Sequence, residues 1–322
     1  MENVKGQDSA VRFLQNSIST GRIANGYLFT GPDGTGKTSA AKSFIAALMC
    51  TAPGRGASGC GNCAVCRRVE SMNHPDVTWI VPERLKRTGI EDIRRVKDRL
   101  SLKPYESSVN VCVIENAHMM TQEAANALLK VLEEPPGRSL IILISDKKEN
   151  LLSTVVSRCV EVRFRHLSGK ETERILREQP GMDDESAKFL ALFSCGSPGR
   201  AIDMASRGLL ERRKSIALLL RDIVREEDPA FLSWDRDDKA GLLEDMEFLV
   251  MFFRDIALRD SAPGAVIDKE LDSDGTYGLF EKYTAEDIFN VIERLAGIRR
   301  ALEGNVNPKL VSPVLPGMLV RG

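Results

Sequence analysis

Short apolar runs alternate with amphipathic stretches along the first half of the chain. The runs are continuous and rich in β-branched residues, a pattern typical of strands buried on both faces of a sheet: 77–81, 109–114 and 140–144. Between them, apolar residues recur at helical spacing on a charged background, first across 90–100 and again across 122–134. Because strands and helices alternate, we expect an α/β fold, in which helices cover both faces of a parallel sheet.

The second half of the chain has a different pattern. From about residue 208 onward, apolar residues follow helical spacing, most clearly over 209–225, 242–259 and 285–302, and no run there has the character of a strand. A charge-rich stretch between the halves contains the compact sequence G-S-P-G-R at 196–200. We therefore expect three domains. They are an α/β domain over 1–166, a small helical domain over 167–207 and a larger helical domain over 208–322.

The composition is that of an ordinary globular protein. Of the 322 residues, 43% are hydrophobic and 28% are charged, and the net charge is −1, so contact with DNA would need a local basic patch or a surface shared with other subunits. Residues 1–6 lack the apolar core of a signal peptide, and the run 248–253 is far shorter than a membrane span. We expect a cytoplasmic protein that binds no membrane.

Residues 31–38 read G-P-D-G-T-G-K-T and match the phosphate-binding pattern G-x-x-x-x-G-K-[ST]. In this pattern the glycines let backbone N–H groups turn toward a polyphosphate, the lysine contacts the β- and γ-phosphates, and the hydroxyl contacts Mg²⁺. The apolar run 27–29 precedes the loop and the alanine-rich stretch 39–49 follows it, which gives the strand–loop–helix order that anion binding requires. The alternative is a glycine-rich turn that matches by chance. The predicted nucleotide-binding residues of the loop are Gly31, Pro32, Asp33, Gly34, Thr35, Gly36, Lys37, Thr38 and Ser39.

Four of the seven cysteines cluster at Cys50, Cys60, Cys63 and Cys66, with the spacing C-x9-C-x2-C-x2-C. This spacing lets a short knuckle place four thiolates around Zn²⁺, so we predict a zinc module over 50–66. Its glycines suit a tight loop: Gly54, Gly56, Gly59 and Gly61. The alternatives are free thiols and an iron–sulfur cluster, although the bacterial ferredoxin pattern needs a cysteine where this chain has Glu70.

A phosphate loop that hydrolyses ATP needs a second strand that carries carboxylates for Mg²⁺ and for the attacking water. The run 111–114 ends in Glu115 and Asn116, which occupy that place. Glu115 can donate an oxygen to Mg²⁺, but the amide of Asn116 cannot accept a proton near neutral pH. General-base help is worth roughly 10²–10⁴-fold in rate, so we expect poor intrinsic hydrolysis. The alternative is that both residues only end the strand.

Together, these motifs resemble those of the delta-prime subunits of bacterial DNA polymerase III clamp loaders, which are AAA+ proteins. The cysteine quartet combined with S-R-C at 157–159 is much more specific than the phosphate loop alone. The matching pieces follow the family's order through the first two domains: Gly6-Gln7, 31–38, the cysteine quartet, His74-Pro75-Asp76, 115–118, 124–130, 132–136, 157–159 and 196–200.

The resemblance implies roles for three further residues. Arg158 would be an arginine finger that reaches the γ-phosphate in a neighbouring subunit, where a guanidinium can be worth roughly 10³–10⁵ in rate; the alternative is an arginine that caps a helix end. Arg200 would be the second sensor, which contacts bound nucleotide from the small helical domain, and its alternative is a surface arginine after a turn. Ser145 lies about where the family has its first sensor, which is more often threonine.

The resemblance also implies a function. The small helical domain would be a lid, and the larger one a collar that assembles with gamma/tau and delta subunits to load the sliding clamp onto primed DNA. The chain would be a delta-prime-like stator, an accessory subunit of a DNA-directed DNA polymerase (nucleotidyltransferase) holoenzyme, with ATP or ADP, Mg²⁺ and Zn²⁺ as cofactors. Motor subunits usually have Asp-Glu in place of Glu115-Asn116. The alternatives are a short gamma/tau-type motor that hydrolyses ATP itself and a scaffold whose loop holds no nucleotide.

Overall fold

The computed structural model describes residues 1, 4–52, 58–82, 87–225, 234–236, 238–304 and 306–319. Residues 53–57 of the predicted zinc module, which include Gly54 and Gly56, lie outside the described residues. All four cysteines of the module are described.

The chain divides into two compact units. The N-terminal unit comprises Met1–Gly181 and Ser194–Ala201, and the C-terminal unit comprises Met182–Phe193 and Ile202–Gly322. The small helical domain expected over 167–207 contributes residues to both units, and the three-domain division stays a prediction.

Five parallel strands form one sheet in the N-terminal unit, in the order β2-β3-β4-β1-β5. Because all strands run in the same direction, each connection must cross over a face of the sheet, and helices make these crossings. The strands are β1 (Gly26–Thr30), β2 (Val77–Ile80), β3 (Asn110–Ile114), β4 (Ser139–Ser145) and β5 (Val160–Arg163).

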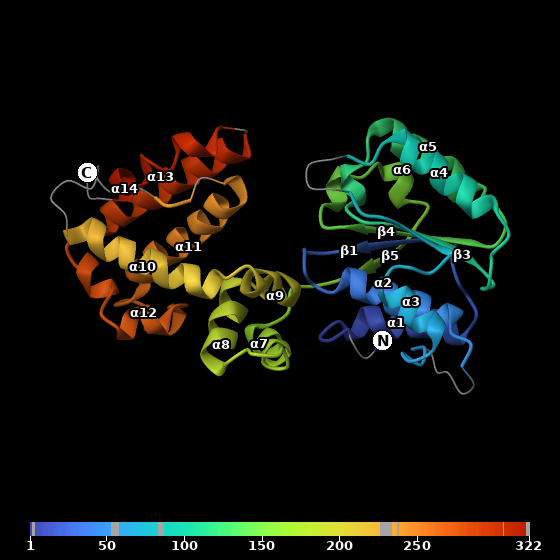
Figure 1. Ribbon diagram of the computed structural model, residues 1–322, viewed down its shortest axis with the longest axis horizontal. Helices are drawn as coiled ribbons and strands as arrows, with labels where there is room; N and C mark the ends of the chain where they lie inside the picture. The colour runs from blue at the N-terminus through green and yellow to red at the C-terminus, as the bar shows by residue number, and fades with distance from the viewer. Residues whose placement is uncertain are drawn as a thin grey trace. The chain divides into compact units, whose positions relative to one another are not determined.

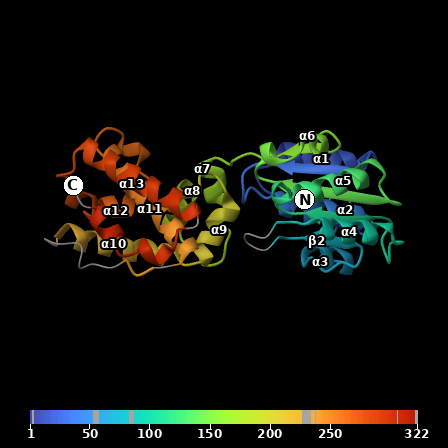
Figure 2. The ribbon, with the colours of Figure 1, turned by 90° about the horizontal axis from the view of Figure 1, so that it is seen from above.

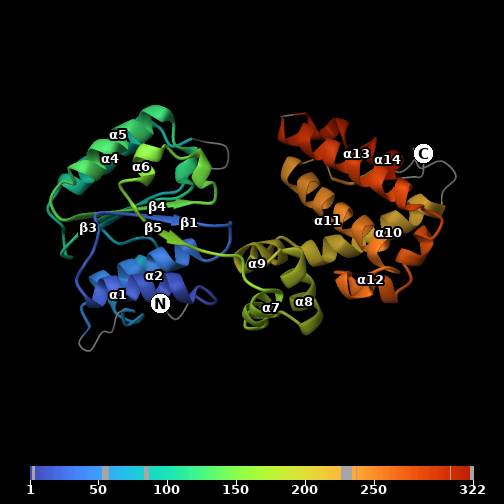
Figure 3. The same ribbon diagram turned by 180° about the vertical axis from the view of Figure 1, so that it is seen from behind.

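Helices cover both faces of this sheet (Figure 1). The view from behind shows the same two layers (Figure 3). One face carries α1 (Asp8–Ser19), α2 (Lys37–Met49) and α3 (Ala64–Glu70). The other carries α4 (Ile90–Ser101), α5 (Gln122–Glu133) and α6 (Ser153–Val156). The unit also contains α7 (Gly169–Arg177) and the 3₁₀ turns η1 (Ala117–Met119) and η2 (Lys148–Asn150).

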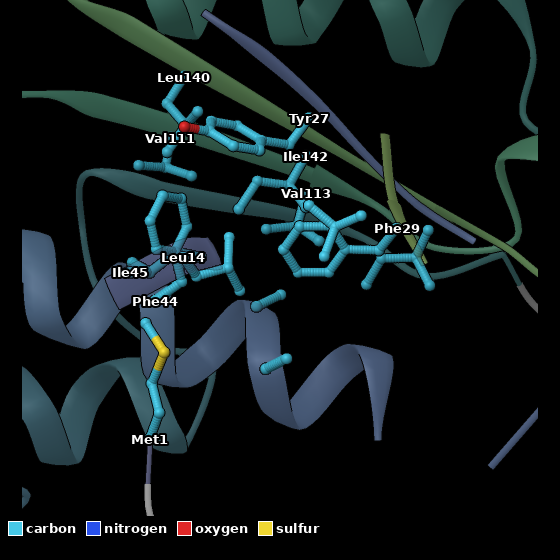
Figure 4. Packing of buried hydrophobic residues seen from close by; sticks show 14 of the residues in the cluster. Met1, Leu14, Tyr27, Phe29, Phe44, Ile45, Val111, Val113, Leu140 and Ile142 are labelled. Atoms are coloured by element: carbon cyan, nitrogen blue, oxygen red, sulfur yellow. The ribbon is translucent and has the colours of Figure 1, made fainter. Parts of the chain in front are cut away.

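The strands contribute alternate residues to two hydrophobic cores. Tyr27 and Phe29 of β1 belong to one core with Phe44 of α2 (Figure 4), where the ring centroids of Tyr27 and Phe44 are 5.2 Å apart. Leu28, between them in sequence, belongs to the other core, which includes Leu128 of α5. This period of two is what a strand buried on both faces requires, and it explains why the runs are apolar at every position.

The described part of the C-terminal unit contains helices and no strand. Its two longest helices, α11 and α13, pack against each other (Figure 2). Beside α11, aromatic rings stack edge to face around Phe252, which lies 5.1 Å from Tyr277 and 5.3 Å from Phe280 between ring centroids. Its helices are α8 (Asp184–Phe193), α10 (Leu209–Arg225), α11 (Lys239–Leu258), α12 (Lys269–Ser273), α13 (Ala285–Glu303) and α14 (Leu315–Leu319), with 3₁₀ turns η4 (Pro263–Ala265), η5 (Tyr277–Phe280) and η6 (Pro308–Leu310); α9 (Pro198–Ser206) has residues in both units.

The predicted fold class is confirmed, because a parallel sheet with helices on both faces is followed by a helical region. The sequence pattern missed β5, whose residues Val160-Glu161-Val162-Arg163 alternate apolar and charged side chains over only four positions. An edge strand of this length is half exposed and therefore lacks the continuous apolar run of its neighbours. None of the helices in the described part of the chain is long and apolar enough to cross a membrane.

Candidate nucleotide-binding site, Arg158 and cysteine cluster

The phosphate loop joins the carboxyl end of β1 to the first turn of α2. Its glycines adopt left-handed or otherwise strained backbone angles, with φ of 138° at Gly31, 68° at Gly34 and 94° at Gly36, the N-cap residue of α2. A Cβ atom at Gly31 would lie 2.2 Å from the carbonyl oxygen of Phe164. Only glycine fits such a position, so local packing as well as backbone angle explains the sequence of the loop.

The G-S-P-G-R sequence packs directly against this loop. The backbone N–H of Gly199 donates to the Gly34 carbonyl at 2.8 Å, and the Ser197 hydroxyl donates to the Asp33 carbonyl at 2.6 Å. A Cβ atom at Gly34 would lie 2.5 Å from the backbone nitrogen of Arg200. The backbone of Arg200, the predicted second sensor, therefore lies beside the loop, although 162 positions separate Arg200 from Thr38 in the numbering.

Gln7 connects the loop to the end of β5, a role that its sequence context did not predict. Its side-chain amide donates to the carbonyls of Thr35 at 3.3 Å and Arg165 at 2.7 Å, and its carbonyl accepts the Arg165 N–H at 3.1 Å. Gln7 is buried. Because a buried amide must be hydrogen-bonded, these contacts fix the loop against the sheet.

Lys37 is buried and turned into the loop. Its ammonium group donates to the carbonyls of Gly31 at 2.7 Å and Pro32 at 2.6 Å. Burial lowers the pKa of Lys37, and the charges of Asp33, Asp146 and Glu115 oppose that shift. The ammonium group therefore has hydrogen-bond partners that phosphate oxygens can replace.

Thr38 and Glu115 meet beside Lys37. The Thr38 hydroxyl donates to Oε1 of Glu115 at 3.1 Å, and burial raises the pKa of this carboxyl although Thr38 and Lys42 oppose the shift. A hydroxyl and a carboxylate oxygen at this distance are the oxygen ligands that Mg²⁺ takes in phosphate-loop proteins. Asn116 follows with φ of 48°, a left-handed angle that asparagine tolerates better than most residues.

Ser145, the predicted first sensor, lies at the carboxyl end of β4, between β1 and β3. Its buried hydroxyl is 3.3 Å from Nδ1 of His118, which is also 3.0 Å from Oδ1 of Asp146. The structure therefore brings the carboxyl ends of β1, β3 and β4 together, where parallel sheets bind ligands. His118 and Asp146 were missed as site residues, because nothing in the sequence shows that these loops meet.

Arg158 lies near the amino end of β1, whereas the phosphate loop follows the carboxyl end of the same strand. A Cβ atom on Gly26, the first residue of β1, would lie 3.3 Å from the carbonyl oxygen of Arg158. The loop begins only after Thr30, the last residue of the same strand. At about 3.3 Å per residue, this strand separates the two by roughly 13 Å. Arg158 is therefore not part of its own chain's phosphate site.

The guanidinium group of Arg158 is partly exposed and has two kinds of partner. Nη2 is 2.5 Å from Oε1 of Glu133, and Nη1 donates to the carbonyl of Thr154 at 3.0 Å. The second contact is the one expected of an arginine that caps a helix end, here the end of α6. In the first contact, the Glu133 carboxylate binds the guanidinium group that the resemblance implies to be an arginine finger.

The four cysteines of the predicted zinc module converge. Their sulfur atoms all lie within 4.8 Å of one another, with 4.0 Å between Cys50 and Cys63 and 3.9 Å between Cys60 and Cys66. Zn–S bonds of about 2.3 Å in a tetrahedron require sulfur atoms about 3.8 Å apart. Backbone N–H groups of Asn62 and Cys63 lower the pKa of the Cys60 thiol to about 6, whereas burial raises the pKa of the Cys66 thiol to about 12, so the distances between the sulfur atoms carry the argument for a metal. The residues fit a tetrahedral zinc ion.

Comparisons with known proteins agree with the predicted resemblance. The model of the family described as DNA polymerase III, delta subunit, matches residues 6–168. The delta' subunit of DNA polymerase III from Bacillus subtilis (strain 168) is 28% identical, and the match covers 98% of this chain and 97% of that protein. The resemblance to delta-prime subunits is thus confirmed.

Two further proteins are similar to this chain. The tau subunit of DNA polymerase III from the same organism is 28% identical, and the match covers 96% of this chain but only 59% of that protein. A solved structure of a gamma subunit-related protein from Thermotoga maritima has a TM-score of 0.48 and 18% identity, over 97% of this chain and 99% of that one. The family model covers half of the sequence, and the chain belongs to the family described as DNA polymerase III, delta subunit.

Proposed function

We propose that this chain is a clamp-loader subunit of the delta-prime type, which binds ATP or ADP, hydrolyses it poorly and supplies Arg158 to a neighbouring subunit. The observation that carries the proposal is the position of Arg158 at the edge of the sheet opposite the phosphate loop. The backbone of Arg158 is roughly 13 Å of strand away from its own loop, and its guanidinium group contacts Glu133 and Thr154, which supports a role at a nucleotide bound elsewhere. The exposed fraction of its side chain, 37%, leaves it accessible to such a neighbour.

Nucleotide binding is supported by the contacts of the loop. Buried Lys37 would bind the β- and γ-phosphates, and Thr38 and Glu115 would hold Mg²⁺, which neutralises phosphate charge when bound. Arg200 would act as the second sensor, because the G-S-P-G backbone contacts the loop, and Ser145 would act as the first. The backbone N–H groups at the start of α2 add partial positive charge to the site.

Poor hydrolysis is supported by the residue at position 116. Its amide can orient a water molecule but cannot take up the proton that the water must lose. Two other carboxylates lie in this region: Oδ1 of Asp33, in the loop itself, accepts the Gly34 N–H at 2.8 Å, and Oδ1 of Asp146 lies 3.0 Å from Nδ1 of His118. We therefore expect the chain to retain nucleotide without efficient turnover.

The partners follow from the family. Gamma/tau and delta subunits would assemble with the collar at 208–322, and the complex would place the sliding clamp on primer–template DNA in the cytoplasm. The domain over 167–207 would be the lid. A zinc ion on the four cysteines would fix residues 50–66 to the end of α2, which begins at the phosphate loop and ends beside Cys50.

A gamma/tau-type motor is the second candidate, and the 28% identity with a tau subunit over 96% of this chain favours it. ATPase activity of the isolated chain distinguishes the two. For the delta-prime type we expect tight binding of ADP by calorimetry, lost in Lys37→Ala, and steady-state turnover close to background. Robust turnover that disappears in Lys37→Ala would establish the motor instead. If the wild-type chain binds no nucleotide, the remaining alternative is a scaffold whose loop holds no nucleotide.

The role of Arg158 is tested in the assembled complex. The chain is combined with the gamma/tau and delta subunits of its own organism, and ATPase is measured with clamp and primed DNA. Arg158→Ala should abolish most of the stimulated activity, since an arginine finger is worth roughly 10³–10⁵ at the site it serves, while the subunits still associate. Unchanged activity in a complex of normal composition would refute the finger.

A further inference from the structure

Glu133 and Arg158 form an ion pair on the face of the sheet that α5 and α6 cover. Glu133 is the last residue of α5, and Arg158 lies between α6 and β5. Their closest approach is 2.5 Å, from Oε1 to Nη2. If Arg158 acts on another subunit, as proposed above, this contact has to break whenever the arginine is used.

The residues beside the pair are packed against the sheet. Leu132 and Cys159, which adjoin Glu133 and Arg158 in sequence, both pack against Gly26: a Cβ atom there would lie 2.9 Å from Cδ2 of Leu132 and 3.3 Å from Sγ of Cys159. Leu132 is buried. Breaking the pair therefore requires a change of only the two side chains, Glu133 and Arg158.

The pair is weak enough to open. The exposed fractions of the two side chains are 37% for Arg158 and 47% for Glu133, and exposed ion pairs shift an equilibrium by less than about tenfold. Glu133 also lines a surface depression of about 330 Å³ together with Lys97 and Lys130. These lysines have no ion pair in the part of the chain that the structure describes, so they can face the carboxylate after Arg158 leaves.

We propose that Glu133 is a positioning residue that holds the Arg158 guanidinium group in the unassembled or resting subunit and releases it to the phosphate of a neighbouring subunit. This inference rests on the proposed function of Arg158. A nucleoside triphosphate presents more negative charge to Arg158 than the single carboxylate of Glu133, whereas a diphosphate lacks the terminal phosphate that Arg158 would reach. Glu133 thereby sets how readily the arginine responds to a neighbour loaded with triphosphate.

The holding contact is tested first in the free chain, without any assumption about assembly. Modification of Arg158 by phenylglyoxal is followed by mass spectrometry in the wild type, in Glu133→Gln and in Glu134→Gln, a matched control that lines the same depression. We expect Arg158 to react about 2- to 5-fold faster in Glu133→Gln and at the wild-type rate in Glu134→Gln. Equal rates in all three chains would overturn the holding contact.

The consequence is then tested in the complex assembled from this chain and its gamma/tau and delta partners. Without clamp or DNA, Glu133→Gln should raise the ATPase rate at subsaturating ATP about 2- to 5-fold, and the ratio to wild type should approach 1 at high salt, because screening weakens the ion pair of the wild type. Glu134→Gln should match the wild type. An unchanged or lower rate in Glu133→Gln would overturn the proposal.

The double variant separates this proposal from the proposed function. In an Arg158→Ala background, Glu133→Gln should have no further effect, because Glu133 acts through Arg158. A rate increase that persists in that background would overturn the role of Glu133 but leave the finger intact. If Arg158→Ala alone changes nothing, the proposed function fails, whatever the phenylglyoxal result.

Discussion

The two ends of the parallel strands in the N-terminal sheet hold a cation in opposite ways. We call them the carboxyl edge, which carries the phosphate loop, and the amino edge, which carries Arg158. At the carboxyl edge, Lys37 is only 6% exposed and donates to carbonyls of its own loop. At the amino edge, Arg158 is partly exposed, and its one ion pair in the described structure is with Glu133. A site that receives an anion must be dry and rigid, so that charge interactions are strong when the ligand arrives. A group that acts on another subunit, as we propose for Arg158, would have to be exposed and weakly held.

The same difference appears in the backbone around each cation. The loop around Lys37 is enclosed by atoms that leave no room for side chains at Gly31 and Gly34. Near Arg158, only its carbonyl oxygen packs against Gly26, and the guanidinium group is partly exposed. Close packing thus surrounds the ligand site in one case and lies beneath a partly exposed side chain in the other.

Removal of the metal should have the largest effect and should act on one edge only. We expect chelation or Cys63→Ser to unfold the module at 50–66, since zinc-finger peptides gain about 10–16 kcal/mol from their ion. The end of α2 at Cys50 would loosen, and ADP affinity measured by calorimetry should fall more than about tenfold. Phenylglyoxal reactivity of Arg158 should stay the same.

The matched control for the metal is Cys195→Ser, at an exposed cysteine outside the cluster. We expect normal zinc content by atomic absorption and normal ADP binding. If chelation lowered neither zinc-dependent stability nor nucleotide affinity, the cysteine cluster would not brace the carboxyl edge. If it also changed the reactivity of Arg158, the two edges would not be independent.

A side chain at Gly34 should weaken nucleotide binding at the carboxyl edge nearly as much. In Gly34→Ala the new Cβ would lie 2.3 Å from the Ser197 hydroxyl oxygen at a left-handed backbone angle, so we expect ADP binding to weaken about tenfold. Gly21→Ala is the control, because φ is also 68° there but no atom lies within 4 Å of the Cβ position. That variant should lose only about 1–2 kcal/mol of unfolding free energy in urea. Equal ADP affinity in both would show that loop enclosure is unimportant.

A carboxylate at position 116 should increase ATP hydrolysis at the carboxyl edge without changing the affinity for nucleotide much. We expect Asn116→Glu to raise the steady-state ATPase rate of the isolated chain about 10- to 1000-fold, since general-base help is worth roughly 10²–10⁴ and a left-handed backbone angle disfavours glutamate. Asn116→Gln has the same length without a basic group and should stay at background. Equal rates in the two variants would mean that the missing base does not limit turnover.

The sequence predicted what local pattern determines and missed what distant segments bring together. The strands and the phosphate loop were predicted because burial on both faces and anion binding leave continuous runs and fixed spacings. Gln7 joins Thr35 to Arg165, and Glu133 meets Arg158 from another helix. Neither contact has a signature in sequence, because the partner lies 25 or more positions away and any glutamine or glutamate could stand there.

The smallest expected effect is on the stability of the fold, and it depends on pH through the carboxylate of Glu161. Glu161 of β5 accepts hydrogen bonds from Thr30 at 2.9 Å, Lys148 at 2.8 Å and Arg163 at 3.0 Å. Although burial alone would raise its pKa, these partners lower the pKa to about 2. A carboxyl whose pKa is lower in the folded state stabilises the fold above its unfolded pKa, about 4.3, and loses this contribution as the pH falls toward 2. Partial exposure limits the gain to about 1 kcal/mol.

Glu161→Gln should therefore lower the unfolding free energy in urea by about 1 kcal/mol at pH 7, and the difference from wild type should shrink as the pH falls from 5 toward 3. Glu133→Gln is the matched substitution at the amino edge, where the carboxylate has one ion-pair partner among the described residues. It should cost less, within a few tenths of 1 kcal/mol, because a single exposed pair is worth little. Equal costs at pH 7 would mean that the amino edge holds its charges as firmly as the carboxyl edge, and that Arg158 is not poised for release.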